Sequence, residues 1–372
     1  MLSRSSVWRH FDLWLLAAVL VLTAYGVLMI HSAITGAPEF EGLDLRQTQF
    51  ALVGLVLMIV VAAVDYRYLT ALHWYLYIAF IGSLIYVALA GVIGNEVQLW
   101  IQVTSTIRIQ PTEFGRIAIA ITFAEFLRQH QHEMHRFSNT IRGLIYIGVP
   151  IVFIFLQPDL GMTIMFAVVW FVMIWMAGLP LSHFAILSIS GVAGIVAIFP
   201  FLAEYQKLRL LSFVTPNAES EIVREQVFNV EQALISVGSG SWWGKGYLQG
   251  TQSQLGFLRV QHTDFIFSML TEEMGFFFGS LVVLFLLGFI MWRILQTAMI
   301  TPDPAGKFIC VGIAGAFFFQ TIVNVGMNMR LLPVTGLTLP FVSYGGSSLW
   351  SLMAAIGVVQ SVRMRHRKQE FG

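Results

Sequence analysis

The strongest candidate for chemistry in this chain is Asp264, which follows His262 and Thr263 at the start of a long apolar run. An acid at such a boundary is a functional candidate, because carrying its charge into hydrocarbon costs several kcal/mol. Its carboxylate can take a proton from an attacking hydroxyl or hold a catalytic cation. It can equally cap a helix, since an aspartate that accepts backbone N–H bonds stabilises a helix start by about 1 kcal/mol. The residues alone leave both roles open.

A second charged group, Glu113 with Arg116, opens another apolar run. Residues three apart share one helical face, so the two charges can pair, which lowers the cost of holding them near a membrane. The pair either orients the segment or contacts a substrate or lipid phosphate. Arg209 and Lys245 are further cations that could neutralise developing negative charge, and each could instead be a snorkelling residue at a membrane interface.

The composition is that of a polytopic membrane protein. Of 372 residues, 57% are hydrophobic and 11% charged, against about 25% charged residues in an ordinary soluble domain. The mean hydropathy is +0.77. A net charge of +1 gives no reason to expect a nucleic-acid partner. Cys310, the single cysteine, lies in an apolar run, which excludes a disulfide framework and indicates a packing residue.

The apolar runs predict an all-α integral membrane fold with about ten spans, forming one domain over residues 1–372. The first run is longer than the apolar part of a signal peptide, so we expect it to be retained as a span. Three runs are short and need tilt or polar continuation to cross a bilayer. The predicted spans are 13–34, 48–64, 72–93, 111–127, 143–157, 160–179, 183–202, 265–292, 307–326 and 347–362.

The distribution of lysine and arginine predicts the orientation. With a cytoplasmic N-terminus, the short outside loops hold only Arg46, Arg108 and Arg330, with Arg116 just inside a span. Basic residues favour the cytoplasmic side of short loops, so both termini are predicted cytoplasmic and the long loop 203–264 extracytoplasmic. The basic residues on the predicted inside are Arg4, Arg9, Arg67, Arg128, Arg136, Arg142, Arg293, Lys307, Arg363, Arg365, Arg367 and Lys368.

The loop 203–264 is long enough to have structure of its own. Its apolar residues recur at helical spacing at Val223, Val227, Val230, Leu234 and Val237. This pattern predicts an amphipathic helix, lying either on the membrane surface or over the outer mouth of the bundle. The glycines that follow indicate a bent, closely approaching backbone, and no strand context supports a phosphate loop. They are Gly238, Gly240, Gly244, Gly246, Gly250 and Gly256.

The run His262-Thr263-Asp264-Phe265-Ile266-Phe267, with Glu272, Glu273 and Gly275 downstream, resembles the signature of the SEDS family of membrane glycosyltransferases, which act in shape, elongation, division and sporulation. Residues 250–255 are closer to the elongation branch of the family than to its division branch. Several further runs resemble family motifs in the same order, from about residue 98 to 348. They are Trp100, Gln110-Pro111-Thr112-Glu113, Gln157-Pro158-Asp159-Leu160-Gly161, Tyr205-Gln206 with Arg209, Leu332 to Gly336, and Leu339 to Ser348, which contains Ser343, Gly345 and Gly346.

The resemblance implies that Asp264 is the catalytic aspartate in the polymerisation of lipid II. The 4-hydroxyl of an acceptor sugar would attack the anomeric carbon of a donor while undecaprenyl pyrophosphate departs, and the acid would act as the base. A divalent cation, Mg²⁺ or Mn²⁺, is a candidate cofactor, the metal being unspecified, and no organic cofactor is expected. The candidates for substrate or lipid-phosphate binding are Arg209, Lys245, Arg116, Glu113, His262, Thr263 and Gln252.

The resemblance also implies a place in the cytoplasmic membrane and a partner, a class B penicillin-binding protein that acts as transpeptidase, among other cell-wall elongation components. Two rival functions are a lipid II flippase and a scaffold without catalysis. A transporter would place charges deep in several spans and pair broken helices at mid-membrane. The acids here gather towards the predicted outer mouth, which favours the enzyme.

The chain departs from the family pattern at four places. Leu99 stands where the family has arginine, Arg116 where it has lysine, Arg259-Val260 where it has Pro-Glu, and Arg330 where it has glycine. These changes affect the mapping of substrate contacts rather than the class. A cluster of histidines lies in a predicted cytoplasmic loop among charged residues, which favours a solvated basic loop over a metal site. It comprises His130, His132 and His135.

Overall fold

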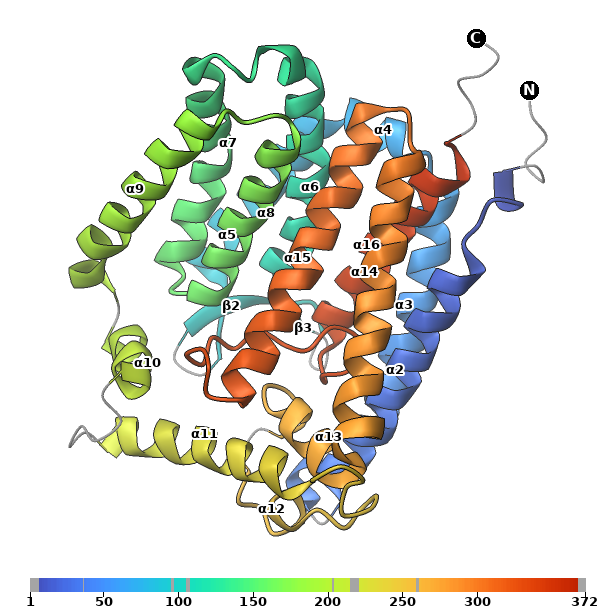
Figure 1. Ribbon diagram of the computed structural model, residues 1–372, viewed down its shortest axis with the longest axis vertical. Coiled ribbons are helices and arrows are strands. Elements are labelled where there is room, and N and C mark those ends of the chain that lie inside the picture. The colour runs from blue at the N-terminus through green and yellow to red at the C-terminus, as the bar shows by residue number, and fades with distance from the viewer. Residues whose placement is uncertain are drawn as a thin grey trace.

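The computed structural model describes residues 7–35, 37–94, 97–104, 108–202, 204–214, 221–258 and 261–366, and it is mostly helical. Each of the ten predicted apolar segments overlaps a helix of a bundle (Figure 1). The helices are α2 (Leu13–Ile34), α3 (Leu43–Ala63), α5 (His73–Ala90), α6 (Pro111–His130), α7 (Phe137–Leu156), α8 (Leu160–Met176), α9 (Leu181–Ile198), α13 (Ile266–Gly275) with α14 (Val282–Ile300), α15 (Pro304–Asn328) and α16 (Gly346–Met364).

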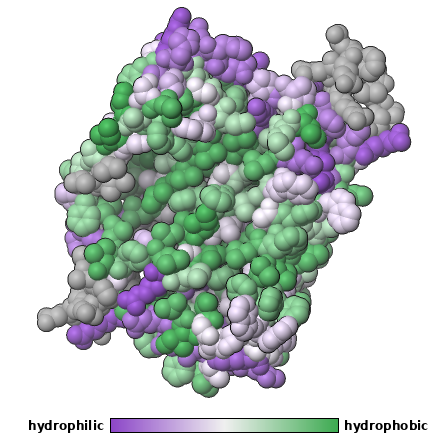
Figure 2. Space-filling model, viewed as in Figure 1, coloured by the Kyte–Doolittle hydropathy of each residue, from purple (hydrophilic) through white to green (hydrophobic). Residues whose placement is uncertain are grey.

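The three short runs lie in helices that extend beyond them. Helix α6 continues through Arg128, and α7 begins before Arg142, so both reach 20 residues, and α16 reaches 19. Within the described part of the chain, six helical segments are long and apolar enough to cross a membrane, and α8 and the first part of α9 are apolar but shorter. Figure 2 shows a hydrophobic band across one face of the molecule, with hydrophilic residues gathered at its two ends. The chain is a multi-pass membrane protein.

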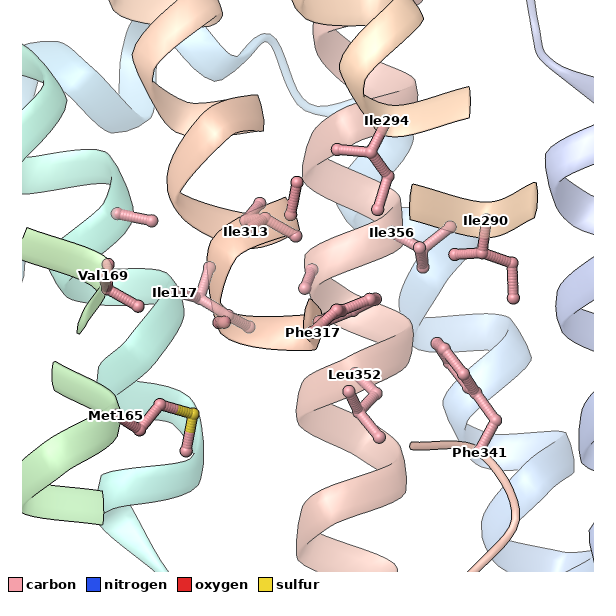
Figure 3. Close-up of a cluster of buried hydrophobic side chains, with 14 of the residues drawn as sticks. Ile117, Met165, Val169, Ile290, Ile294, Ile313, Phe317, Phe341, Leu352 and Ile356 are labelled. Carbon is pink, nitrogen blue, oxygen red and sulfur yellow. The ribbon is translucent and has the colours of Figure 1, made fainter. Parts of the chain in front are cut away.

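The core lies around α15, most of whose side chains are buried. Figure 3 shows how the helices meet there: Ile313 and Phe317 of α15 lie between side chains from α6, α8, α14 and α16. Phe341, from the loop before α16, closes one end of the cluster. The loop that carries Phe341 is therefore fixed against the same core as the helices.

The predicted span 265–292 falls almost entirely within an apolar helical segment, Ile266–Ile300, whose backbone is irregular near its start. Gly275 has a φ of +74°, and a short π-helix, η4 (Phe276–Leu281), joins α13 to α14. Only glycine enters this left-handed region without steric cost. The hydropathy of the segment does not reveal this conformation, because Met274 and Phe276, the direct neighbours of Gly275, are apolar.

A small antiparallel sheet precedes α6, and the analysis of apolar runs did not predict it. It consists of β1 (Val92–Gly94), β2 (Val97–Gln102) and β3 (Arg108–Ile109). Trp100 pairs with Val92, and Ile101 pairs with Ile109. The departure Leu99 lies in β2. The sheet delivers the chain to Gln110, directly before α6.

The loop 203–264 contains the predicted helix, α11 (Glu221–Ser239), which crosses one end of the bundle (Figure 1). Ala233 and Ser236 are fully buried and Val230 packs against the core, whereas Leu234 is 40% exposed. Ala233 and Ser236 therefore face the bundle, and Leu234 of the predicted apolar stripe faces away from it. This packing favours a helix over the mouth of the bundle rather than one lying free on a membrane. The loop also contains α10 (Glu204–Val214) and α12 (Thr251–Gln254).

The remaining short elements are α4 (Tyr66–Ala71), η1 (Pro38–Phe40), η2 (Gln131–Glu133) and η3 (Phe199–Phe201). The beginning of α2 and the end of α16 lie at one end of the bundle, and α11 crosses the opposite end (Figure 1). The first and last spanning helices thus begin and end on the same side of the band that Figure 2 shows. The loop with Asp264 belongs to the other side.

Candidate functional site

The glycine-rich segment after α11 packs directly on α13. The N–H groups of Lys245 and Gly246 donate to the carbonyls of Glu272 and Glu273, at 3.0 and 2.9 Å. A Cβ built on Gly244 would lie 2.1 Å from the Glu273 carbonyl oxygen, and one on Gly275 would lie 2.3 Å from the Gly244 nitrogen. The two backbones can approach this closely only without side chains, as the glycine pattern predicts.

Two fully buried glutamates hold this segment. Glu272 pairs with Lys245 at 2.7 Å and accepts bonds from the N–H groups of Gln252 and Ser253. Glu273 accepts a bond of 2.7 Å from the hydroxyl of Ser32 on α2. Lys245 was a candidate for binding a lipid phosphate. Its described contacts instead hold the loop against α13.

We expect Gly244→Ala to lower the free energy of unfolding by about 1 to 3 kcal/mol, the usual cost of inserting atoms into a well-packed site. Gly244 also has a φ of +80°, which an alanine tolerates poorly. The matched control is Gly238→Ala, since a Cβ there meets nothing within 4 Å. Thermal unfolding of the two purified variants in detergent would measure the difference, and equal midpoints would contradict the packing described here.

The backbone around Asp264 is fixed by polar side chains from elsewhere in the chain. The Asp264 carbonyl accepts bonds from the amide groups of Asn324 and Asn328, at 3.2 and 3.0 Å. The hydroxyl of Ser343 donates to the Thr263 carbonyl at 2.7 Å, and the Tyr344 N–H donates to the His262 carbonyl at 2.9 Å. The loop before α16 therefore holds the Asp264 loop in place, which supports a structural role for Ser343.

The carboxylate of Asp264 is not the cap of α13. That helix begins at Ile266, and its N-cap residue, Phe265, makes no side-chain cap bond. Burial raises the pKa of the Asp264 carboxyl, while the charge of Arg209 and a hydrogen bond from the Thr263 hydroxyl oppose the rise. The capping alternative thus loses its basis, and the acid has an environment suited to proton transfer.

Arg209 of α10 lies within electrostatic reach of a second acid, Asp159, as well as of Asp264. Asp159 caps α8 by accepting a bond of 3.0 Å from the Met162 N–H, and it accepts another of 3.1 Å from the side-chain amide of Gln110. Burial, with the nearby charge of Glu113, raises the pKa of Asp159 to about 6. One arginine therefore serves two acids whose burial favours their neutral forms.

The predicted pair of Glu113 and Arg116 is present and buried, with both side chains less than one-tenth exposed. The Arg116 guanidinium also donates to Gln320 of α15 and to the Ser351 hydroxyl of α16. Gln320 in turn donates to the Thr338 carbonyl at 2.8 Å. The pair ties three helices together, which supports its structural interpretation.

Comparison of the sequence with known protein families identifies the family of this chain. A sequence model described as cell cycle protein, covering FtsW, RodA and SpoVE, matches residues 13–368. The chain belongs to this family. It is the SEDS family that the motifs resemble, and the match covers the motifs on both sides of Asp264.

Curated relatives of the family align along nearly their whole length. Stage V sporulation protein E of Bacillus subtilis is 34% identical over 94% of this chain and 96% of its own. Peptidoglycan glycosyltransferase MrdB of Escherichia coli is 34% identical over 96% of this chain and 95% of its own. The RodA peptidoglycan glycosyltransferase of Treponema pallidum is 31% identical over 95% and 98%.

Solved structures of SEDS proteins share the fold. A chain in a peptidoglycan synthase complex that coordinates polymerisation and crosslinking superposes with a TM-score of 0.80, at 27% identity, covering 96% of this chain and 99% of that one. The crystal structure of the rod shape determining protein RodA of Thermus thermophilus gives a TM-score of 0.71 at 27% identity, covering 96% and 98%.

The other predicted SEDS motif residues have mainly structural contacts. Gln157 donates from its side-chain amide to the Leu84 carbonyl, and the Gly345 N–H donates to Gln47. A Cβ on Gly346 would lie 3.0 Å from the ring of Phe50. The ring of His262 lies 4.7 Å from that of Phe40 at an angle of 49°, and burial lowers the pKa of His262.

The histidine cluster lies far from this site, at the end of the bundle that carries the termini. The ring of His130 bonds the Phe126 carbonyl, and His132 and His135 are exposed. No group of three histidine, cysteine or acidic side chains within the described ranges could hold a metal ion. The histidine cluster therefore offers no metal site within those ranges.

Asn324 and Asn328, which position Asp264, are residues that the sequence reasoning missed. Together with Gln320 they recur every four residues along α15, so they share one face of an otherwise apolar helix. Polar amides in a buried apolar helix need partners, because an unbonded polar group there is costly. Their spacing was a usable signal for a helix that faces the site.

Besides Leu99 in β2, two departures from the family pattern make contacts in the structure, Arg330 and Arg116. Arg330 has a φ of +56°, the region that favours glycine, and its guanidinium pairs with Glu231 of α11 at 3.2 Å. The arginine thereby fastens α11 to the end of α15. Arg116 fills the position of the family lysine within the buried pair. Arg259 and Val260 lie outside the described residues.

Proposed function

We propose that this chain is a peptidoglycan glycosyltransferase of the elongation type, which polymerises lipid II at the outer face of the cytoplasmic membrane. The observation that carries the proposal is Asp264: it is partly buried, it caps no helix, and the charge of Arg209 reaches it. The curated relatives named MrdB and RodA, which align along nearly the whole chain, support the elongation type.

In this proposal Asp264 is the general base. Its carboxylate takes the proton from the acceptor 4-hydroxyl while that oxygen forms a bond to the donor's anomeric carbon, and the bond to the pyrophosphate oxygen breaks. A base is most effective with a pKa near the working pH, so a raised pKa helps the carboxylate to accept the proton. The amides of Asn324 and Asn328 hold the backbone of the base in position.

Arg209 is the cation best placed to compensate the departing pyrophosphate. It is partly exposed, near Asp264, and close to the loop at Gly336, where a Cβ would lie 3.9 Å from its Nη1 atom. A planar guanidinium can bind phosphate oxygens in a bidentate manner. Arg116 and Lys245 are committed to Glu113 and Glu272, so we assign them to the scaffold. A divalent cation beside the pyrophosphate remains part of the proposal, with Mg²⁺ or Mn²⁺ as the candidates.

The proposed partner is a class B penicillin-binding protein. The structurally similar chain in a peptidoglycan synthase complex supports this, since that complex couples polymerisation to crosslinking. Joining the two activities in one assembly would keep a growing glycan strand next to the enzyme that crosslinks it.

A lipid II flippase is the rival function. Its mechanism would call for paired broken helices at mid-membrane. The described residues contain a break at Gly275, but the charged groups that surround Asp264 lie at the end of the bundle crossed by α11. This asymmetry favours surface chemistry over transport through the bundle.

The test is polymerisation of purified lipid II by the purified chain with its transpeptidase, analysed as glycan ladders. The proposal predicts ladders in detergent, where no bilayer separates two compartments. Movement of lipid II across vesicles without ladders would instead establish the flippase, and neither activity in a folded, partner-bound protein would establish the scaffold.

The pH dependence of this reaction should report the charge of Arg209. A base acts when ionised, so the rate rises as pH passes through its pKa. Because Arg209 opposes the rise in the pKa of Asp264, we expect Arg209→Gln to move the acid limb of the kcat/KM profile to higher pH. Lys207→Gln is the matched control on α10, since Lys207 pairs with Glu204. An unmoved limb in the Arg209 variant would separate its charge from the base.

Cysteine labelling should establish the orientation. Gln249 lies in the glycine-rich segment at the Asp264 end, Ser138 lies at the other end, and both are exposed. With the Asp264 end outside, Gln249→Cys should react with an impermeant reagent in intact cells, and Ser138→Cys only after lysis. Cys310 is fully buried and gives little background. The opposite labelling pattern would invert the topology and remove the proposed mechanism.

A further inference from the structure

A polar pocket lies at the end of the bundle opposite to Asp264, where α2 begins and α16 ends. It has a volume of about 390 Å³ and lies between the N-terminal segment, α14 and α16. Its charged side chains are Arg9, Arg293, Arg363 and Asp12. None of these side chains has a role in the proposed glycosyl transfer.

The pocket carries an excess of positive charge. The buried carboxylate of Asp12 pairs with Arg293 at 2.6 Å and with Arg363 at 3.3 Å. One carboxylate cannot neutralise two guanidiniums, and Arg9 adds a third positive charge at the rim. Two histidines, His10 and His366, stand beside the arginines with their rings 5.3 Å apart. An anion is the ligand that this set of donors fits.

The two inner arginines are held rigidly. Asp12 receives two donors from Arg293, and its backbone exchanges two bonds of 2.9 Å with the side chain of Gln360 on α16. Arg363 also donates to the Thr297 hydroxyl at 3.2 Å. Both guanidiniums are mostly buried, with side-chain exposures of 12% and 17%. Fixed donors lose little conformational entropy when they bind an anion.

The wall of the pocket on the surface of the bundle is apolar. Leu13 and Trp14 of α2 are about two-thirds exposed, and Ile300 ends α14 beside them. A tryptophan at the end of a spanning helix is typical of the membrane interface. The pocket thus presents arginines to a headgroup and apolar side chains to the chains attached to it. In the proposed orientation it faces the cytoplasmic leaflet, where basic pockets between helices bind anionic headgroups.

We propose that this pocket binds the phosphate of an anionic phospholipid such as phosphatidylglycerol. Arg9, Arg293 and Arg363 hold the phosphate, and the acyl chains lie along Leu13 and Trp14. The bound lipid joins the first and last spanning helices at the cytoplasmic end. The site does not depend on glycosyl transfer, because it lies at the end of the bundle opposite to Asp264.

Lipid retention by the full chain, measured by native mass spectrometry with phosphatidylglycerol or phosphatidylcholine, tests the proposal. The variant is Arg9→Gln with Arg363→Gln, which leaves Asp12 its partner Arg293. We expect the apparent affinity for phosphatidylglycerol to fall about 25-fold, the fold-change for two basic residues worth about 1 kcal/mol each. Arg9→Gln alone, an exposed change that leaves the buried pairs intact, should give about fivefold.

The matched control removes two arginines at the same end but outside the pocket, Arg136→Gln with Arg142→Gln. An equal loss in this control would mean that surface charge, and not the pocket, attracts the lipid, and would overturn the proposal. Equal retention of phosphatidylcholine by the unmodified protein would do the same. Inorganic phosphate is the second arm: displacement of the lipid at equal concentration would assign the pocket to a soluble anion. Failure of phosphate to compete, with loss only in the pocket variants, supports the phospholipid.

Discussion

Asp264→Asn is expected to reduce glycan polymerisation by at least about 10²-fold, the lower end of the usual contribution of a general base. Asparagine has nearly the size of aspartate and can accept a hydrogen bond from Thr263. Its side-chain amide is not basic enough to take a proton from a hydroxyl. The backbone contacts of Asp264 with Asn324 and Asn328 use its carbonyl, so the substitution leaves them in place. Folding, insertion and partner binding should therefore be nearly unchanged.

The measurement is glycan-ladder formation from lipid II by the folded, partner-bound variant, with lipid II binding measured alongside. Binding should persist, since other groups of the site carry the uniform part of substrate affinity. Asp44→Asn is a control at the same end of the bundle, because the Asp44 carboxylate contacts the half-exposed His31 and the N–H of its neighbour Leu45. Near-normal ladders from Asp264→Asn would exclude the acid as the base, and the catalytic centre would have to lie elsewhere.

The helices were predictable because a membrane span requires a long, continuous run of hydrophobic residues. The orientation of α11 was only half predictable. Its periodicity located the helix but not the face that meets the bundle, since Ala233 is fully buried in the core and Leu234 is 40% exposed. Periodicity ranks faces by hydrophobicity, whereas packing at a close crossing also selects by size.

The sequence predicted the acid of the site, Asp264, but not the residues that hold its backbone in place. Asp264 stood out as a charge at the edge of an apolar run, and the break at Gly275 and the amides of α15 did not. Asn324 and Asn328 lie some 60 residues along the chain from the carbonyl that they hold. A contact of that kind depends on how helices are arranged in space, which local sequence patterns do not encode. The Asp159–Arg209 relation has the same origin.

The second large effect concerns the buried pair. Glu113→Ala would leave the Arg116 guanidinium, which is 2% exposed, with only the neutral partners Gln320 and Ser351. Removing one member of a buried pair usually costs about 3 to 5 kcal/mol, because the remaining charge stays desolvated without compensation. We therefore expect a clear fall in the thermal midpoint and in the yield of folded protein, in addition to any loss of activity.

Thermal unfolding in one detergent, with two comparison variants, separates charge burial from other causes. Glu133→Ala breaks a pair of the same spacing, Glu133 with Arg136, whose side chains are 49% and 61% exposed. An exposed pair contributes about 0 to 1 kcal/mol, so this control should unfold near the wild-type temperature. Glu113→Ala combined with Arg116→Met removes both charges and should be more stable than Glu113→Ala alone. If instead the double variant is the less stable of the two, the loss comes from packing around Glu113, and the uncompensated charge of Arg116 is not its cause.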